Sequence, residues 1–177
     1  MLDQRSSLES EAHAYLDHAV LRLILDTNRP LSEAEIGRAI DVPGHVPDSL
    51  KRLRRASLIH RWNDLATPSH PAVRLHAITQ SNREDPAGTE DCRHESAVLE
   101  TLLRSANDGA RPLSKEQLHD ALSARKRKQQ ARINAALDRL DAAGLIERRG
   151  GQSIASEVAM HFNHLITPGE RTEHDAI

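Results

Sequence analysis

Residues 114–151 read SKEQLHDALSARKRKQQARINAALDRLDAAGLIERRGG, and this stretch decides the fold that the sequence predicts. Its first part begins with Ser114, a residue type that caps helix N-termini by accepting a backbone hydrogen bond. Leu118 and Leu122 follow four residues apart, which places them on one face of a helix. The sequence therefore predicts a short helix over residues 114–122.

A second helix follows in the same stretch. Ile133, Leu137 and Leu140 recur at helical spacing, and Gly144 stands where a helix would end in the left-handed conformation. No glycine or proline separates the two helices. A helix-turn-helix interpretation therefore requires the chain to turn near Ser123–Ala124, and one continuous helix would exclude it.

Two short strands are predicted after the second helix. Residues 145–149 (LIERR) and 152–155 (QSIA) flank the pair Gly150–Gly151. Gly-Gly between two short runs indicates a hairpin, because tight primed turns need positive φ at their central residues. The predicted order is helix, turn, helix and hairpin.

The first half of the chain contains the same series of residues. The matching segments are 19–21 with 97–99, 30–32 with 112–114, 50–53 with 137–140 and 58–61 with 145–148. Their offsets are 78, 82 and 87, and the offset grows only where loops are expected, as in a repeated fold whose loops vary in length. The sequence therefore predicts one structural unit present twice.

A helix-turn-helix followed by a hairpin tipped with arginines resembles the bacterial winged helix-turn-helix transcriptional regulators. The resemblance covers roughly residues 10–166 and implies a mainly α fold with small β-hairpin wings (α+β), built as two winged helix-turn-helix domains in tandem. The expected organisation is a first domain over 1–79 with an N-terminal helical extension, a polar linker over 80–93, a second domain over 94–166 and a disordered tail over 167–177.

The composition excludes several classes of protein. With one Trp, one Tyr and one Phe, the chain lacks the aromatic platforms on which single-stranded nucleic acids stack. Its single Cys excludes an internal disulfide. No signal peptide and no long apolar run is present, so we expect a cytoplasmic protein with no membrane partner.

The net charge is only −2, but residues 125–128 (RKRK) form a basic run without an acid. The resemblance implies that the second helix of the later copy and its wing contact DNA. The glutamines would read adenine, and the arginines would contact guanine or phosphate. The expected DNA-binding residues of this copy are Arg125, Lys126, Arg127, Lys128, Gln129, Gln130, Arg132, Arg148 and Arg149. The hypothesis requires Arg127, Arg132 and Arg148 to share one side and to remain free of acidic partners.

The first copy is a weaker DNA-binding candidate. Its corresponding helix carries Lys51, Arg52 and Arg55, which are included among the expected DNA contacts, but Asp48 near its start would repel a phosphate. Its hairpin turn, Asn63–Asp64, also carries an acid. We expect the neighbouring Trp62 to lie against the hydrophobic core.

No catalytic motif and no cofactor-binding motif is found, and we do not expect an enzyme. Glu157, His161 and His164 share one face of the last predicted helix, at a spacing that suits a metal ion. They also flank an apolar stripe as in any amphipathic helix. We therefore expect neither a metal nor a cofactor.

Two functions follow from these expectations. The first is a duplex-DNA-binding transcriptional regulator that acts as a homodimer on a two-part site. The alternative is a protein-interaction adaptor, similar to the tandem winged-helix subunit of bacterial chromosome segregation that clasps a kleisin. The near-neutral charge favours the alternative, and the local basic run favours the first.

Overall fold

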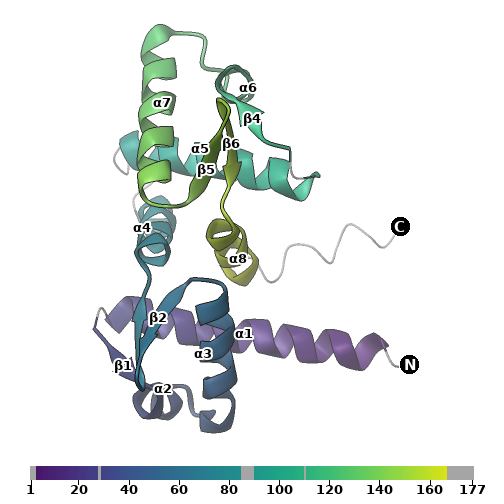
Figure 1. Cartoon of the computed structure of the whole chain (residues 1–177), viewed down its shortest axis with the longest axis vertical. Coiled ribbons are helices and arrows are strands. Elements are labelled where there is room, and N and C mark those ends of the chain that lie inside the picture. Colours follow the sequence, from purple (N-terminus) through teal and green to yellow (C-terminus); the bar gives the residue numbers. More distant parts are fainter. Residues whose placement is uncertain (1–2, 28, 85–89, 110, 167–177) are drawn as a thin grey trace. The chain divides into compact units, whose positions relative to one another are not determined.

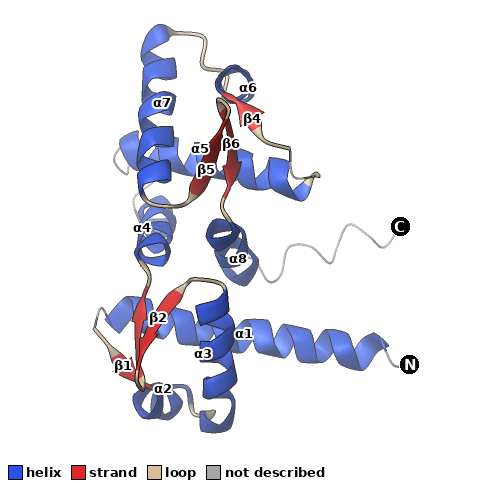
Figure 2. Cartoon of the chain, viewed as in Figure 1, coloured by secondary structure: helices blue, strands red, loops and turns tan. Residues whose placement is uncertain are grey.

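A computed structural model describes residues 3–27, 29–84, 90–109 and 111–166. The chain is mainly helical and carries small antiparallel hairpins, which confirms the α+β class (Figures 1 and 2). It divides into two compact units, Met1–Ala72 with His161–Ile177 (unit 1) and Val73–Met160 (unit 2). The tail that was expected to be disordered, residues 167–177, lies outside the described part of the chain.

Unit 1 places three helices beside a three-stranded sheet. Its strands are ordered β1-β3-β2, with every neighbouring pair antiparallel. The predicted hairpin is β2–β3, whereas the two-residue strand β1 was not predicted. The elements are α1 (Asp3–Thr27), β1 (Leu31–Ser32), α2 (Glu33–Ile40), the 3-10 helix η1 (Pro43–His45), α3 (Val46–Arg55), β2 (Ile59–Trp62), β3 (Leu65–Pro68) and the start of α4 (His70–Glu84).

Unit 2 repeats this order of elements. Its sheet is ordered β4-β6-β5, again antiparallel throughout, and α5 crosses behind α7 and contacts it (Figure 1). The elements are the rest of α4, α5 (Glu90–Asn107), β4 (Leu113–Ser114), α6 (Lys115–Ala121), α7 (Arg127–Ala142), β5 (Ile146–Arg149), β6 (Gln152–Ala155) and the start of α8 (Glu157–Ile166), whose residues from His161 belong to unit 1.

The same local devices form the helix ends in both units. Ser32 caps α2 and Ser114 caps α6, each completed by a side chain three residues later, Glu35 or Gln117. Ser57 (φ 58°) and Gly144 (φ 70°) both take the left-handed conformation after α3 and α7. A serine thus replaces the glycine usual at that position, at some cost in backbone strain.

Aliphatic side chains from the helices and the buried sheet face form the core of each unit. The largest fully buried residues include Ile24, Ile36, Leu50, Leu53 and Leu58 in unit 1, and Leu102, Leu118, Leu137, Leu140 and Leu145 in unit 2. Each buried leucine or isoleucine contributes about 1.5–3 kcal/mol relative to exposure. The residues whose spacing predicted the repeat are therefore the ones that fill the two cores.

The polar segment 80–93, expected from the sequence as a linker, is largely helical. It is helical as far as Glu84 and again from Glu90, with 85–89 outside the described residues. Glu90 and Asp91 lie in the first turn of α5, where negative charge complements the helix dipole. On α1, which begins at Asp3, Asp17 is buried and Tyr15 is 73% exposed.

A buried carboxylate joins the first helix to the third in both units. Asp17 of α1 accepts two hydrogen bonds from Arg52 of α3, both of 2.7 Å. In unit 2, Glu95 of α5 is fully buried and accepts from Arg139 of α7 and from Arg74 of α4. Asp17 and Glu95 are 78 positions apart, and Arg52 and Arg139 are 87 apart. These are the offsets of the sequence repeat.

Replacing Glu95 by Ala should lower the free energy of unfolding of the chain by about 3 kcal/mol, because two arginines then lose their buried partner. Both arginine side chains remain about one-third exposed, which keeps the loss near the low end for a buried pair. Urea unfolding followed by circular dichroism measures it. Asp108→Ala removes an exposed carboxylate directly after the same helix and should change stability by less than about 0.5 kcal/mol. Equal effects of the two substitutions would contradict this role of Glu95.

The capping glutamate of α2 should make unit 1 sensitive to acid. The backbone N–H of Ser32 and the side chain of Arg29 donate to Glu35 and lower its pKa from 4.5 to about 2. Because the folded-state pKa is lowered, the stabilisation is complete above pH 4.5 and is lost as the pH falls towards 2. Glu35→Gln should thus destabilise the chain at pH 7 and have little effect at pH 2. A stability difference between wild type and variant that does not change with pH would refute this prediction. Glutamine can form the same cap, because Gln117, which does not titrate, does so at the equivalent position in unit 2.

Candidate nucleic-acid interface

The turn between α6 and α7 is built by local backbone contacts. α6 ends at Ala121, and Ser123 then takes a left-handed conformation (φ 53°). The Ala124 N–H donates to the His119 carbonyl at 2.7 Å, and its side chain is only 5% exposed. The chain therefore turns at Ser123–Ala124 as predicted, and α6 and α7 are separate helices.

Four cations occupy this turn and the start of α7. Arg125 and Lys126 precede the helix, and Arg127 and Lys128 form its first residues; all four are exposed. Within the described part of the chain, none of them has an acidic partner, and the first turn of α7 contains no acid. We call residues 125–128 the basic turn. Positive charge at a helix N-terminus opposes the helix dipole by a few tenths of a kcal/mol, so folding does not account for it.

The side chains of the two glutamines that follow form hydrogen bonds within the chain. The Gln129 side-chain carbonyl accepts from the Lys126 N–H at 3.2 Å, as in a capping box. The Gln130 amide donates to the Ala124 carbonyl at 3.1 Å. Both side chains therefore help to shape the basic turn, and a contact with adenine would require these bonds to be exchanged.

The other expected DNA contacts of unit 2 have acidic partners. Arg132 pairs with Glu90 at 2.8 Å, and Arg148 pairs with Asp138 at 2.6 Å. Arg149 pairs with its strand neighbour Glu147 but remains 87% exposed. Of the three arginines that the DNA hypothesis required to be unpaired, only Arg127 meets the condition among the described residues. The pairs of Arg132 and Arg148 therefore count against the hypothesis in that form, and a DNA contact would have to use the basic turn instead.

In α3 of unit 1, most of the expected contacts are also engaged. Lys51 pairs with Asp48 at 2.9 Å and lowers the pKa of that carboxyl. Arg52 is held by Asp17, whose hydrogen bond raises the pKa of the guanidinium. Arg55 is exposed at the end of the helix. α3 therefore presents fewer exposed, unpaired cations than the basic turn of unit 2.

The two hairpins differ on their outward faces. In unit 2, Arg149 lies opposite Gln152, a polar pair. In unit 1 the equivalent pair is Trp62 opposite Leu65, and these side chains are 79% and 38% exposed. The expectation that Trp62 packs into the core was wrong, because alternation along β2 turns Ile59 inward and Trp62 outward.

Comparison with models of known families finds no match to this chain, and a search of curated proteins finds none either. Among the described residues, no group of three His, Cys, Asp or Glu side chains is placed to hold a metal ion. None of the described helices has the length and apolar character needed to cross a membrane.

Trp62 is the only tryptophan, so intrinsic fluorescence reports on the β2–β3 hairpin. A side chain that is 79% exposed should emit at the wavelength of N-acetyltryptophanamide in water and be quenched by acrylamide almost as readily. The measurement is made on dilute protein, with that free amide as the reference. A blue-shifted, protected emission under these conditions would contradict the exposed position.

Proposed function

We propose that each unit is a winged helix-turn-helix domain and that the chain is a duplex-DNA-binding transcriptional regulator. The observation that carries the proposal is the basic turn, four exposed cations at the start of α7 that have no acidic partner among the described residues. In a winged helix-turn-helix, this end of the second helix approaches the DNA major groove. The order of elements and the hairpin after α7 support this assignment.

The basic turn suits phosphate contacts. Lysine and arginine side chains neutralise phosphates and release condensed counterions, which provides affinity without sequence preference. Gln129 and Gln130 hold the turn in shape, so they position the cations before any base is contacted. Arg149, 87% exposed at the tip of the β5–β6 hairpin, is the wing residue best placed to reach a second phosphate.

The paired arginines have a different role in this proposal. Arg148 ties the hairpin to α7 through Asp138, and Arg132 ties α7 to α5 through Glu90. These bonds orient the helix and the wing relative to each other within unit 2. The DNA footprint is therefore narrower than the set of cations expected from the sequence.

We further propose that the chain acts as a homodimer on a two-part site. Regulators of this class commonly bind pseudo-palindromic sites whose symmetry mirrors that of the protein. The single basic turn in each chain supports this view, because one turn offers few phosphate contacts. Two copies would double them.

The experiment compares two charge-matched double variants. Arg127→Gln with Lys128→Gln removes two cations of the basic turn, whereas Arg104→Gln with Arg111→Gln removes two exposed cations elsewhere in unit 2. Binding to a labelled duplex is measured by fluorescence anisotropy at several salt concentrations. The first variant should weaken binding and reduce the slope of log K against log salt by about 1–2. The second should leave the slope unchanged.

Equal losses in the two double variants would refute the basic turn as the contact. A wild-type chain without salt-dependent affinity for duplex DNA would refute the function itself.

A second candidate function is protein binding through unit 1, as in a tandem winged-helix adaptor that clasps a kleisin. The exposed pair Trp62 and Leu65 favours it, because exposed tryptophan is enriched at protein interfaces. Asp64, in the same hairpin turn, disfavours a phosphate at this site. The two functions use different units and are compatible in one chain.

A further inference from the structure

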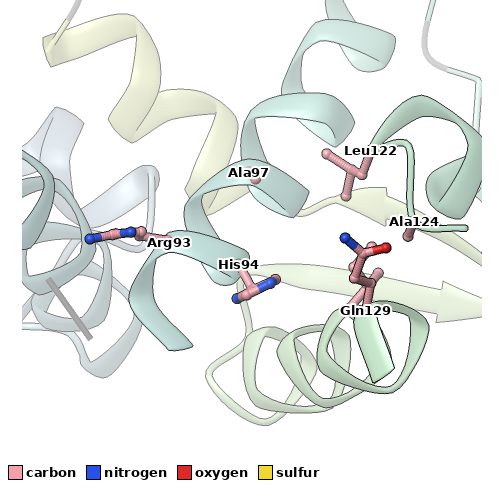
Figure 3. Close-up of a pocket in the computed structure, with 7 residues that line it drawn as sticks. Arg93, His94, Ala97, Leu122, Ala124 and Gln129 are labelled. Atoms are coloured by element: carbon pink, nitrogen blue, oxygen red, sulfur yellow. The ribbon is translucent and has the colours of Figure 1, made fainter. Parts of the chain in front are cut away.

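A cavity of about 320 Å³ lies in unit 2 beside the basic turn. It is lined by α5, by the turn after α6 and by the first turns of α7 (Figure 3). The apolar part of the lining consists of Ala97, Leu122, Ala124 and Ile133, and the polar part consists of Arg93, His94 and Gln129. Among the residues that the structure describes, no carboxylate lines the cavity.

The Gln129 side chain offers hydrogen-bond donors to a ligand, and His94 offers one ring nitrogen. The side-chain carbonyl of Gln129 is already engaged by the Lys126 N–H, which leaves its amide hydrogens for a ligand. The Nδ1 of His94 lies against the Glu90 carbonyl, which can only accept, so Nδ1 carries a hydrogen and Nε2 is left for a ligand. Figure 3 shows His94 extending toward Gln129, whereas Arg93 extends away from it.

The electrostatic surroundings favour a negative ligand. Arg93 stands at the edge of the cavity, and the basic turn begins directly after Ala124 in its lining. Ligand pockets combine an apolar lining with a few polar groups that fix orientation, and this volume is at the small end of their range. The site therefore suits a compact molecule with one anionic end.

We propose that this cavity binds a small organic carboxylate with an apolar body of about one ring in size. The apolar body would lie on Leu122 and Ile133. The carboxylate would accept hydrogen bonds from the Gln129 amide, which adjoins the basic turn.

The same ligand should weaken DNA binding, an effect that rests on the function proposed above. Gln129 caps Lys126, and Ala124 precedes Arg125, so the cavity and the basic turn share backbone. A bound anion lowers the positive potential that attracts phosphate. By linkage, DNA must weaken binding of the carboxylate by the same factor.

The direct test uses phenylacetate and its neutral amide, phenylacetamide, on the full chain at matched ionic strength. Isothermal titration calorimetry should show phenylacetate binding at least fivefold more tightly than the amide. Gln129→Glu should weaken phenylacetate binding at least tenfold, because a carboxylate then lines the cavity. Glutamate at this helix position also caps well, so folding is preserved.

The matched control is Gln117→Glu. It makes the same change at the capping position of α6, away from the cavity, and should leave phenylacetate affinity unchanged. Absence of phenylacetate binding, equal binding of acid and amide, or equal losses in the two variants would overturn the proposal.

Duplex binding by the wild-type chain, with and without phenylacetate, separates this proposal from the proposed function. Weaker duplex binding in phenylacetate but not in phenylacetamide supports both. Phenylacetate binding by a chain that has no duplex affinity supports the cavity and refutes the regulator. Duplex binding by a chain that does not bind phenylacetate supports the proposed DNA-binding function and refutes the proposed carboxylate site.

Discussion

The structure of each unit depends on one buried ion pair between its first and third helices. Asp17 holds Arg52 in unit 1, and Glu95 holds Arg139 in unit 2. Burying a carboxylate is costly unless charged donors satisfy it, so each pair permits only a narrow range of helix positions. The third helix in turn positions the turn that precedes it and the hairpin that follows it. Glu95 also binds Arg74 of α4, which lies within unit 2 as well.

The distribution of acidic partners divides the cations into two groups. Arg52, Arg132, Arg139 and Arg148 hold helices and hairpins together, whereas residues 125–128 face solvent and have no such partner in the described part of the chain. The two units thus share the arrangement of their helices and strands but differ in the side chains that they expose. Unit 2 presents cations, and unit 1 presents Trp62 and Leu65.

Most of the fold could be predicted from local signals. Ser32 and Ser114 mark helix starts, and Gly150–Gly151 marks a hairpin, because these residues act through their own backbone geometry. The short strands β1 and β4 could not be predicted in this way. Their pairing with β3 and β6 involves residues far apart in the chain, and two residues carry no alternating pattern.

The sequence by itself determined the repeat, the order of elements and the position of the basic run, because spacing and residue type act locally. Only the tertiary structure decided which cations are accessible. The partners of Arg132 and Arg52 lie 42 and 35 positions away, and no periodicity encodes such contacts. The outward position of Trp62 was likewise decided by the sheet, because strand register determines which alternate side chains reach the core.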